Sequence, residues 1–229
     1  MIYRFYCAYP DVTQEYMESI LKLVGNVKEF EVFRFQEDTP YVVDEDGEKK
    51  RYTFILKDDR ENEFWLYTAC GYSGEGPRTT RAILHLLGLK DDFKISKEGN
   101  NHIVESDLRP VHKINLLIAQ DKAEQYRSPK RAYISLLSLE FKYAYQRKNF
   151  MDALKLMGYI QNVRKDDALN EKSYLFSWFD VSEEDYYYPT NNMVTLRSVF
   201  RDFSKENIEV MIKELIEKTG GEITEEKEV

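Results

Sequence analysis

The sequence has few of the residues from which metal centres and thiol-based active sites are built. It contains only 2 Cys and 3 His in 229 residues. Two cysteines are too few for a structural zinc site, and the histidines do not cluster with them in the sequence. Cys7 and Cys70 lie in strand-like segments, which favours a pair of buried thiols in a reducing compartment. We therefore expect no metal, no cofactor and a cytoplasmic location.

The short motifs of the common enzyme classes are also absent. The sequence has no GxSxG, no HExxH, no HRD with DFG, no GxxxxGK[ST] and no GxGxxG. A nucleophilic Cys70 would need a histidine base, and no local signature links it to His85, His102 or His112. We interpret these three histidines as structural. The sequence therefore gives no positive sign of catalysis, although it does not exclude it.

Long apolar runs are missing as well. Without a run of about 18 apolar residues, no transmembrane helix is expected, and the first ten residues lack the pattern of a signal peptide. Hydrophobic residues make up 42% and charged residues 32%, which is typical of a soluble globular protein. The net charge of −8 argues against nucleic-acid binding, which depends on neutralising phosphates. The Lys-, Asn- and Tyr-rich usage suits a low-GC bacterium or its phage.

The first half of the chain combines strand patterns with two helical ones. Strands are predicted at 2–9, 30–35, 41–43, 51–56, 64–70, 93–96 and 101–105, and helices at 13–24 and 77–87. The first strand is aromatic on both faces, so we expect it in the middle of a sheet. This order favours an α+β fold with a mostly antiparallel sheet and two helices on one face. A ferredoxin-like core with an extra hairpin is one version of it.

The acidic segment DEDGEKK at 44–50 lies between two of these strands. Its carboxylates suggest calcium, but the spacing is not that of an EF-hand. Asp46-Gly47 is instead typical of a hairpin turn, so we predict a solvated hairpin tip.

From about residue 109 helical spacing dominates. Helices are predicted at 115–126, from Pro129 to about 144, from a cap at Asn149, and at 194–203 and 204–218. The charged tail at 222–229 is expected to be frayed. The predicted organisation is therefore an α+β domain at 1–108 followed by an α-helical domain at 109–229.

The most informative stretch is the glycine-rich turn between the strand at 64–70 and the helix that ends at Gly88. Free N–H groups at the helix start, together with nearby arginines, would hold a phosphate or carboxylate. The candidate ligand-binding residues are Ser73, Gly74, Gly76, Arg78 and Arg81. Against this interpretation, Glu75 places a negative charge in the turn. The alternative is that the glycines only supply the positive φ of a tight turn.

A second unusual stretch, YLFSWFDVSEEDYYYPTNN at 174–192, mixes aromatic rings with acidic residues. Such sequences are typical of interface hot spots. The candidate interface residues are Trp178, Phe179, Tyr186, Tyr187 and Tyr188. The alternative is that these rings fill the junction between the two domains. The sequence does not separate the two interpretations, because exposure cannot be read from it.

Together these patterns favour a non-catalytic binding protein. It would act through protein contacts or by holding a small anionic ligand at the glycine-rich turn, and homo-oligomers are compatible with either. One alternative is an enzyme acting on a nucleotide or another phosphate-bearing substrate, with Ser73, Arg78 and Arg81 gripping the phosphate. A weaker alternative is an acidic inhibitor of a nucleic-acid-binding or defence protein.

Overall fold

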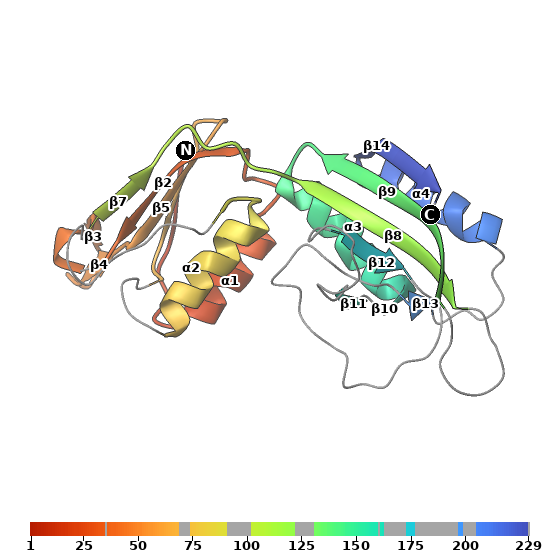
Figure 1. Cartoon of the computed structure of the whole chain (residues 1–229). Helices are drawn as coiled ribbons and strands as arrows, with labels where there is room; N and C mark the ends of the chain where they lie inside the picture. Colours follow the sequence, from red (N-terminus) through yellow and green to blue (C-terminus); the bar gives the residue numbers. More distant parts are fainter. Residues whose placement is uncertain are drawn as a thin grey trace. The chain divides into compact units, whose positions relative to one another are not determined.

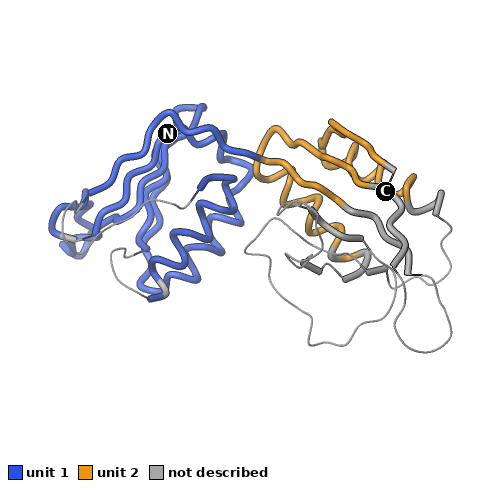
Figure 2. The backbone as a smooth tube through the Cα atoms, in the orientation of Figure 1, with its two compact units in different colours: residues 1–111 blue, residues 112–229 orange. Residues whose placement is uncertain are grey.

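The computed structural model divides the chain into two compact units, Met1–Val111 and His112–Val229 (Figure 2). It describes residues 1–34, 36–68, 74–90, 102–121, 131–159, 161–162, 173–176, 197–198 and 205–228. Both units combine helices with mostly antiparallel sheets, so the predicted α+β class is confirmed. The predicted domain boundary at 108/109 lies close to the division at 111/112. No helix in the described part of the chain is long and apolar enough to cross a membrane.

The N-terminal unit is a sheet with two helices. Its elements are β1 (Ile2–Phe5), α1 (Pro10–Ser19), β2 (Val27–Phe33), the short 3-10 helix η1 (Gln36–Asp38), β3 (Tyr41–Val43), β4 (Lys49–Arg51), β5 (Phe54–Asp58), β6 (Glu63–Leu66), α2 (Glu75–Leu86) and β7 (His102–Glu105). The sheet has the order β1-β6-β5-β2-β7, and β1 is parallel to β6 while the other pairs are antiparallel. β3 and β4 form a separate hairpin.

Both helices lie side by side on one face of this sheet (Figure 1). The strands bury alternate residues against them because successive side chains point to opposite faces. The fully or almost fully buried set on this face comprises Phe30, Val32, Phe54, Leu56, Phe64 and Leu66 from the strands, and Met17, Ile83 and Leu84 from the helical layer. Each such side chain contributes about 1.5–3 kcal/mol by leaving water. The opposite face of the sheet carries polar and aromatic side chains.

Three details of this unit differ from the sequence-based expectation. β1 is an edge strand with alternating exposure, not a central one. The ferredoxin-like arrangement is therefore not confirmed, because that fold has its first strand inside the sheet. Helix α1 begins at Pro10 and has no side-chain cap. Proline fits this position because its missing N–H is not needed there. Thr13, the predicted first residue of this helix, lies inside α1, where it is buried and donates to the carbonyl oxygen of Tyr67 at 3.2 Å.

The acidic hairpin tip is held by its own backbone and one cross-strand ion pair. The Asp44 carboxylate accepts from the backbone N–H groups of Asp46 and Glu48, and Gly47 has φ +80°. Lys50 lies 2.9 Å from Asp44, and its hydrogen bond holds the pKa of that carboxyl below its ordinary value. Among the described residues no group of His, Cys, Asp and Glu is arranged to hold a metal ion.

The C-terminal unit has a five-stranded sheet, whereas helical spacing predicted helices. Its elements are β8 (Lys113–Asp121), β9 (Arg131–Phe141), α3 (Ala144–Met157), β10 (Gly158–Tyr159), β11 (Gln161–Asn162), β12 (Ser173–Phe176), β13 (Arg197–Ser198), α4 (Lys205–Thr219) and β14 (Gly221–Glu228). The sheet order is β11-β12-β8-β9-β14, and β10 pairs with β13. The predicted helix at 115–126 and the one from Pro129 are wrong, because β8 and β9 form an antiparallel pair there.

The core of this unit explains why these segments are strands. Ile114 and Leu116 of β8 are buried while Lys113 is exposed, and Leu137 and Leu139 of β9 are buried on the same side. This alternation with a period of two fits a strand with one buried face. The full core cluster is Ile114, Leu116, Leu137, Leu139, Phe141, Phe150, Leu154, Ile212 and Ile216.

The ends of this unit also differ from the expectation. Asn149 lies inside α3, which begins five residues earlier, so it is no cap. The backbone N–H of Tyr143 donates instead to Oε1 of Gln146 at 3.0 Å, one half of a capping box. The last helix, predicted at 204–218, matches α4, and Gly220 directly after it has φ +77°. The tail beyond it is not frayed but forms β14, which pairs with β9.

Candidate functional site

The start of α2 is the region where the sequence placed a ligand site. Ser73 lies outside the described residues, as does Cys70. Gly74 precedes the helix in an extended conformation with φ −178°, and Gly76 is buried in the first turn. Arg78 and Arg81 are both exposed, one turn apart on the same helix. The structure thus places four of the five predicted residues at the start of one helix, and two of them carry a positive charge to the surface.

A buried hydrogen bond attaches α2 to the segment that follows β6, and a turn motif ends the helix. The side-chain hydroxyls of Thr80 and Thr68 form a 2.7 Å hydrogen bond, and both residues are fully buried. At the other end Gly88 has φ +73°, and its N–H donates to the carbonyl oxygen of His85. The N–H of Leu89 donates to the carbonyl oxygen of Leu84, which completes a Schellman motif. Arg78 and Arg81 therefore project from a helix that a buried hydrogen bond holds in place.

The first turn of α2 itself is a weak place for an anion. Gly74 has no side chain, and no side-chain hydrogen bond caps the helix. The N–H groups of a first turn attract negative charge, but Glu75 occupies the first helical position and brings a charge of that sign. We therefore place the candidate anion site at Arg78 and Arg81, on the outward side of α2, and not in the turn before the helix.

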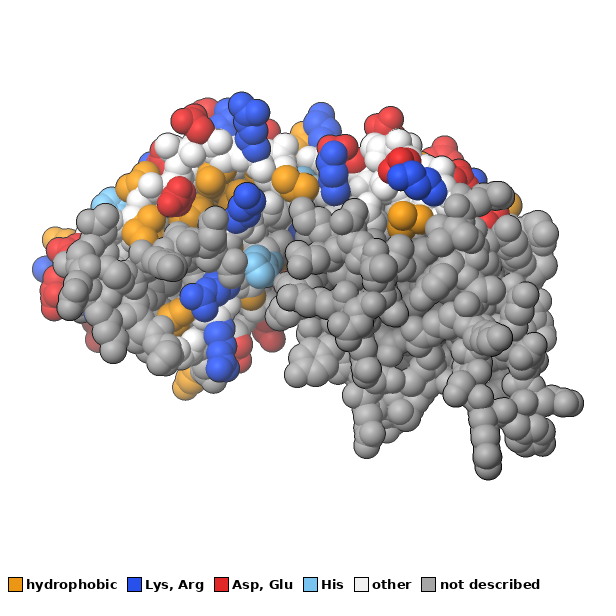
Figure 3. Space-filling model, viewed as in Figure 1, with side chains coloured by type: hydrophobic (Ala, Val, Ile, Leu, Met, Phe, Trp, Pro, Cys, Tyr) orange, Lys and Arg blue, Asp and Glu red, His pale blue; other side chains and the backbone are white. Residues whose placement is uncertain are grey.

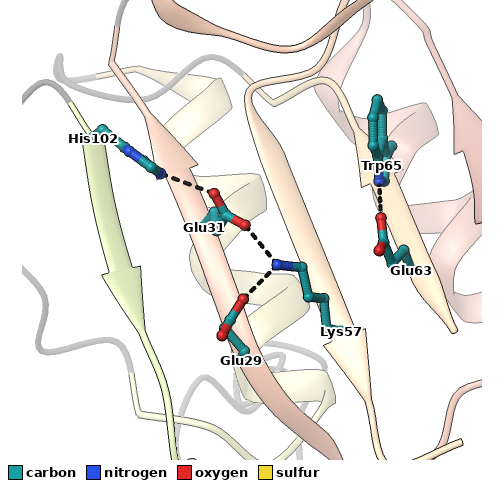
Figure 4. Close-up of polar contacts among 6 residues, drawn as sticks. All are labelled: Glu29, Glu31, Lys57, Glu63, Trp65 and His102. Carbon is teal, nitrogen blue, oxygen red and sulfur yellow. Dashed lines mark hydrogen bonds and ion pairs between the residues drawn. The ribbon is translucent and has the colours of Figure 1, made fainter. Parts of the chain in front are cut away.

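The open face of the N-terminal sheet holds a chain of charged side chains that the sequence did not reveal (Figure 4). Nζ of Lys57 on β5 lies 2.6 Å from Glu29 and 2.9 Å from Glu31, both on β2. The other carboxylate oxygen of Glu31 lies 3.0 Å from Nε2 of His102 on β7. The His102 ring stacks on Phe33 with 4.2 Å between ring centroids. These contacts connect three neighbouring strands. We call Glu29, Glu31, Lys57 and His102 the charge ladder.

The charge ladder shifts the protonation of its members. Burial acts to raise the pKa of Glu31, but the hydrogen bonds from Lys57 and His102 outweigh it and hold the pKa below its ordinary value. Hydrogen bonds to Glu29 and Glu31 raise the pKa of Lys57 well above its usual range. Both groups therefore stay charged over the physiological range. Because each carboxylate is engaged across strands, we interpret the ladder as a sheet-stabilising device rather than a catalytic group.

Aromatic side chains continue the same face toward β1. The Trp65 ring N–H donates to Glu63 at 2.7 Å, and the Arg4 guanidinium lies 4.9 Å from the Trp65 ring centroid. Tyr52 packs edge-on against Trp65 at 5.8 Å and is itself buried. Burial raises the pKa of the Tyr52 hydroxyl. The Tyr52 and Trp65 rings pack against each other, and Arg4 packs on Trp65, so this part of the face is closely packed.

The three histidines lie in three different environments. His85 is exposed on α2. His102 belongs to the charge ladder. His112 is buried, and burial together with the nearby Arg147 lowers its pKa to about 4. Cys7, the cysteine in the described part of the chain, is half-buried and forms no disulfide.

Residues 177–192 of the aromatic-acidic stretch lie outside the described residues, so the candidate interface residues Trp178, Phe179, Tyr186, Tyr187 and Tyr188 stay a prediction. Comparisons with protein-family models, with curated proteins and with solved structures found no match to this chain.

Proposed function

We propose that this chain is a non-catalytic binding protein and that its N-terminal unit takes an anionic partner on the outward side of α2. The observation that carries this proposal is the exposure of Arg78 and Arg81 on one rigidly held helix. Arginine is well suited to the task because its planar guanidinium pairs with carboxylates and phosphates through two parallel hydrogen bonds.

The local charge supports this assignment. The whole chain has a net charge of −8, yet residues 76–90 contain no Asp or Glu and include two Arg, one His and one Lys. A positive surface of this kind attracts a negative partner over several ångströms, until salt screens it beyond about 10 Å.

Thermal unfolding in the presence of anions tests the proposal. The panel consists of inorganic phosphate, nucleotides, sugar phosphates and an acidic peptide of glutamates. A ligand at about 100 times its dissociation constant stabilises the native state by roughly 2.7 kcal/mol, which raises the unfolding temperature measurably. We expect the stabilisation to disappear in the variant with Arg78→Ala and Arg81→Ala.

The matched control removes two exposed lysines of the same unit, with Lys28→Ala and Lys49→Ala. This variant loses the same formal charge and should keep the stabilisation. Equal loss in both variants would mean that only net charge matters, and stabilisation that survives in the arginine variant would show that the anion binds elsewhere. Either result would refute the proposed site.

A further inference from the structure

The outward side of α2 carries a row of basic side chains. Arg78, Arg81 and His85 are all exposed and follow one another at i, i+3 and i+7, a spacing that places side chains on one side of a helix. Thr80 and Leu84, on the opposite side, are fully buried against the sheet. We call Arg78, Arg81 and His85 the basic stripe. Figure 3 shows Lys, Arg and His side chains gathered over this helix.

The outward side of α1 carries a matching row of carboxylates. Asp11, Glu15 and Glu18 follow one another at i, i+4 and i+7, and the first two are exposed while Glu18 is half-buried. Thr13 and Met17, on the opposite side of α1, are fully buried. We call Asp11, Glu15 and Glu18 the acidic stripe. Since both stripes extend over seven residues, each is about 10 Å long.

The two stripes belong to one continuous surface. α1 and α2 are in contact and cover the same face of the sheet (Figure 1). The outer surface of this helical layer is therefore acidic along one helix and basic along the next. A half-turn about an axis that runs along the helices places each α1 opposite the α2 of a second copy. Such a surface is complementary to itself, as a two-fold dimer requires.

We propose that the N-terminal unit associates with a second copy of itself, with the acidic stripe of each copy on the basic stripe of the other. This inference rests on the proposed function, because it names the anionic partner of Arg78 and Arg81. Tyr9 and Val12, at the start of α1, are exposed large hydrophobic residues that add apolar area beside the acidic stripe. Exposed ion pairs are weak singly and are screened by salt, so the dimer forms at high protein concentration and dissociates as salt is added.

Sedimentation equilibrium of the full chain at low and high salt, up to about 1 mM protein, tests the proposal. The first variant combines Arg78→Glu with Arg81→Glu, and the second combines Asp11→Arg with Glu15→Arg. Each alone brings like charges together at both contacts, so each should raise the dimer dissociation constant by more than about 100-fold. An equimolar mixture of the two restores opposite charges at both contacts and should recover the dimer.

The control variant Lys28→Glu with Lys49→Glu changes the net charge as much as the first variant does and should dimerise like the wild type. Far-ultraviolet circular dichroism of each variant shows that it is folded. Recovery in the mixture cannot come from misfolding, because unfolded chains would not regain a specific complex. A wild-type chain that stays monomeric at low salt, or a mixture that stays monomeric, would overturn the proposal.

The same measurements separate this inference from the function on which it rests. If the wild type is monomeric while an anion of the panel still stabilises it through Arg78 and Arg81, self-association fails and the proposed function stands. If the chain dimerises through the two stripes and no anion stabilises it, the second copy is the partner. Dimerisation that the arginine variant does not weaken refutes this inference, and the anion panel then decides on the proposed function by itself.

Discussion

The Asp58 carboxylate accepts a 2.7 Å hydrogen bond from the backbone N–H of Gly25, which lies 33 residues earlier in the chain. The same buried carboxylate accepts from the backbone N–H groups of Arg60 and Asn62 at 2.9 and 2.8 Å, and from the Asn62 amide at 3.1 Å. One side chain thus closes the turn between β5 and β6 and attaches the segment that leads from α1 into β2.

Asp58→Asn should destabilise the protein markedly. An amide can accept through only one of its two atoms, so two of the four donors lose their partner and face an N–H group instead. Buried unsatisfied donors cost about 1–3 kcal/mol each, and we expect a loss of about 3 kcal/mol in the free energy of unfolding, measured with urea. Asp59→Asn is the matched control, because the exposed Asp59 accepts one backbone hydrogen bond, from Asn26. A similar loss in both variants would contradict the role assigned to Asp58.

Lys57→Ala should cost less, in spite of the short distances in the charge ladder. The Lys57 side chain is 39% exposed, so solvent screens its ion pairs and the loss should be about 1 kcal/mol or below. Without the ammonium, Glu29 and Glu31 face each other, and the pKa of Glu31 should rise. Carbon-detected NMR titration of the Glu31 carboxyl measures this shift, with Lys28→Ala as the control. An unchanged pKa would show that Lys57 does not hold Glu31 in its charged form.

His112 should make stability depend on pH between about 6.5 and 4. Its folded-state pKa of about 4 lies below the ordinary value, so the unfolded chain binds the proton more readily. The stabilisation is complete above pH 6.5 and is lost as the pH falls through 4. The contribution of His112 to the free energy of unfolding changes by about 3 kcal/mol between the two ends of this pH window.

The His112 contribution is isolated by comparing wild type and His112→Gln in urea unfolding at a series of pH values. Carboxylates titrate equally in both proteins, so they cancel from the difference. The difference in the free energy of unfolding between wild type and His112→Gln should change by about 3 kcal/mol between about pH 6.5 and pH 4. Parallel curves would show that His112 titrates normally.

Phe150→Ala tests the core of the C-terminal unit. Phe150 is fully buried in α3 and its ring lies 5.4 Å from that of Phe141 on β9. Truncation should cost about 3–5 kcal/mol. Leu156→Ala on the same helix is the matched control, since Leu156 is 88% exposed and should change stability by less than about 0.5 kcal/mol. Comparable effects of the two substitutions would contradict the packing of α3 on this sheet.

The N-terminal unit is largely predictable because its strands have a recognisable local sequence pattern. Phe30 and Val32, or Phe64 and Leu66, alternate with polar or half-buried residues within a few positions, and Gly88 marks the end of α2. The edge position of β1 was not predictable. Its aromatic residues suggest burial on both faces, but its place is decided by pairing with β6, some 60 residues later in the chain.

The sequence-based prediction for the C-terminal unit is wrong where helix propensity and strand pairing favour different structures. β9 is rich in Leu, which favours helices, and Tyr133, Leu136, Leu137 and Phe141 also fit helical spacing. The competing signal was Leu137, Leu139 and Phe141 with a period of two, which the structure shows to be the buried set. Pairing of β9 with both β8 and β14 overrides the local preference.

The candidate site was predictable only in part. Arg78 and Arg81 were visible because they are close together in the sequence and follow a turn. The charge ladder was not, since Glu31, Lys57 and His102 come from three strands and meet only in the folded sheet. The alternation of Glu29 and Glu31 with the buried Phe30 and Val32 was the one local sign of a charged face on β2.

The parallel pairing of β1 with β6 has a consequence for synthesis on the ribosome. Ile2–Phe5 are made some 60 residues before their partner residues Glu63–Leu66. The antiparallel strands β2, β5 and β6 can associate as they appear, whereas β1 has no strand to join until the middle of the N-terminal unit has been translated. Closing so long a loop delays such a contact, so β1 is made before the other strands of this unit but is among the last of them to be ordered.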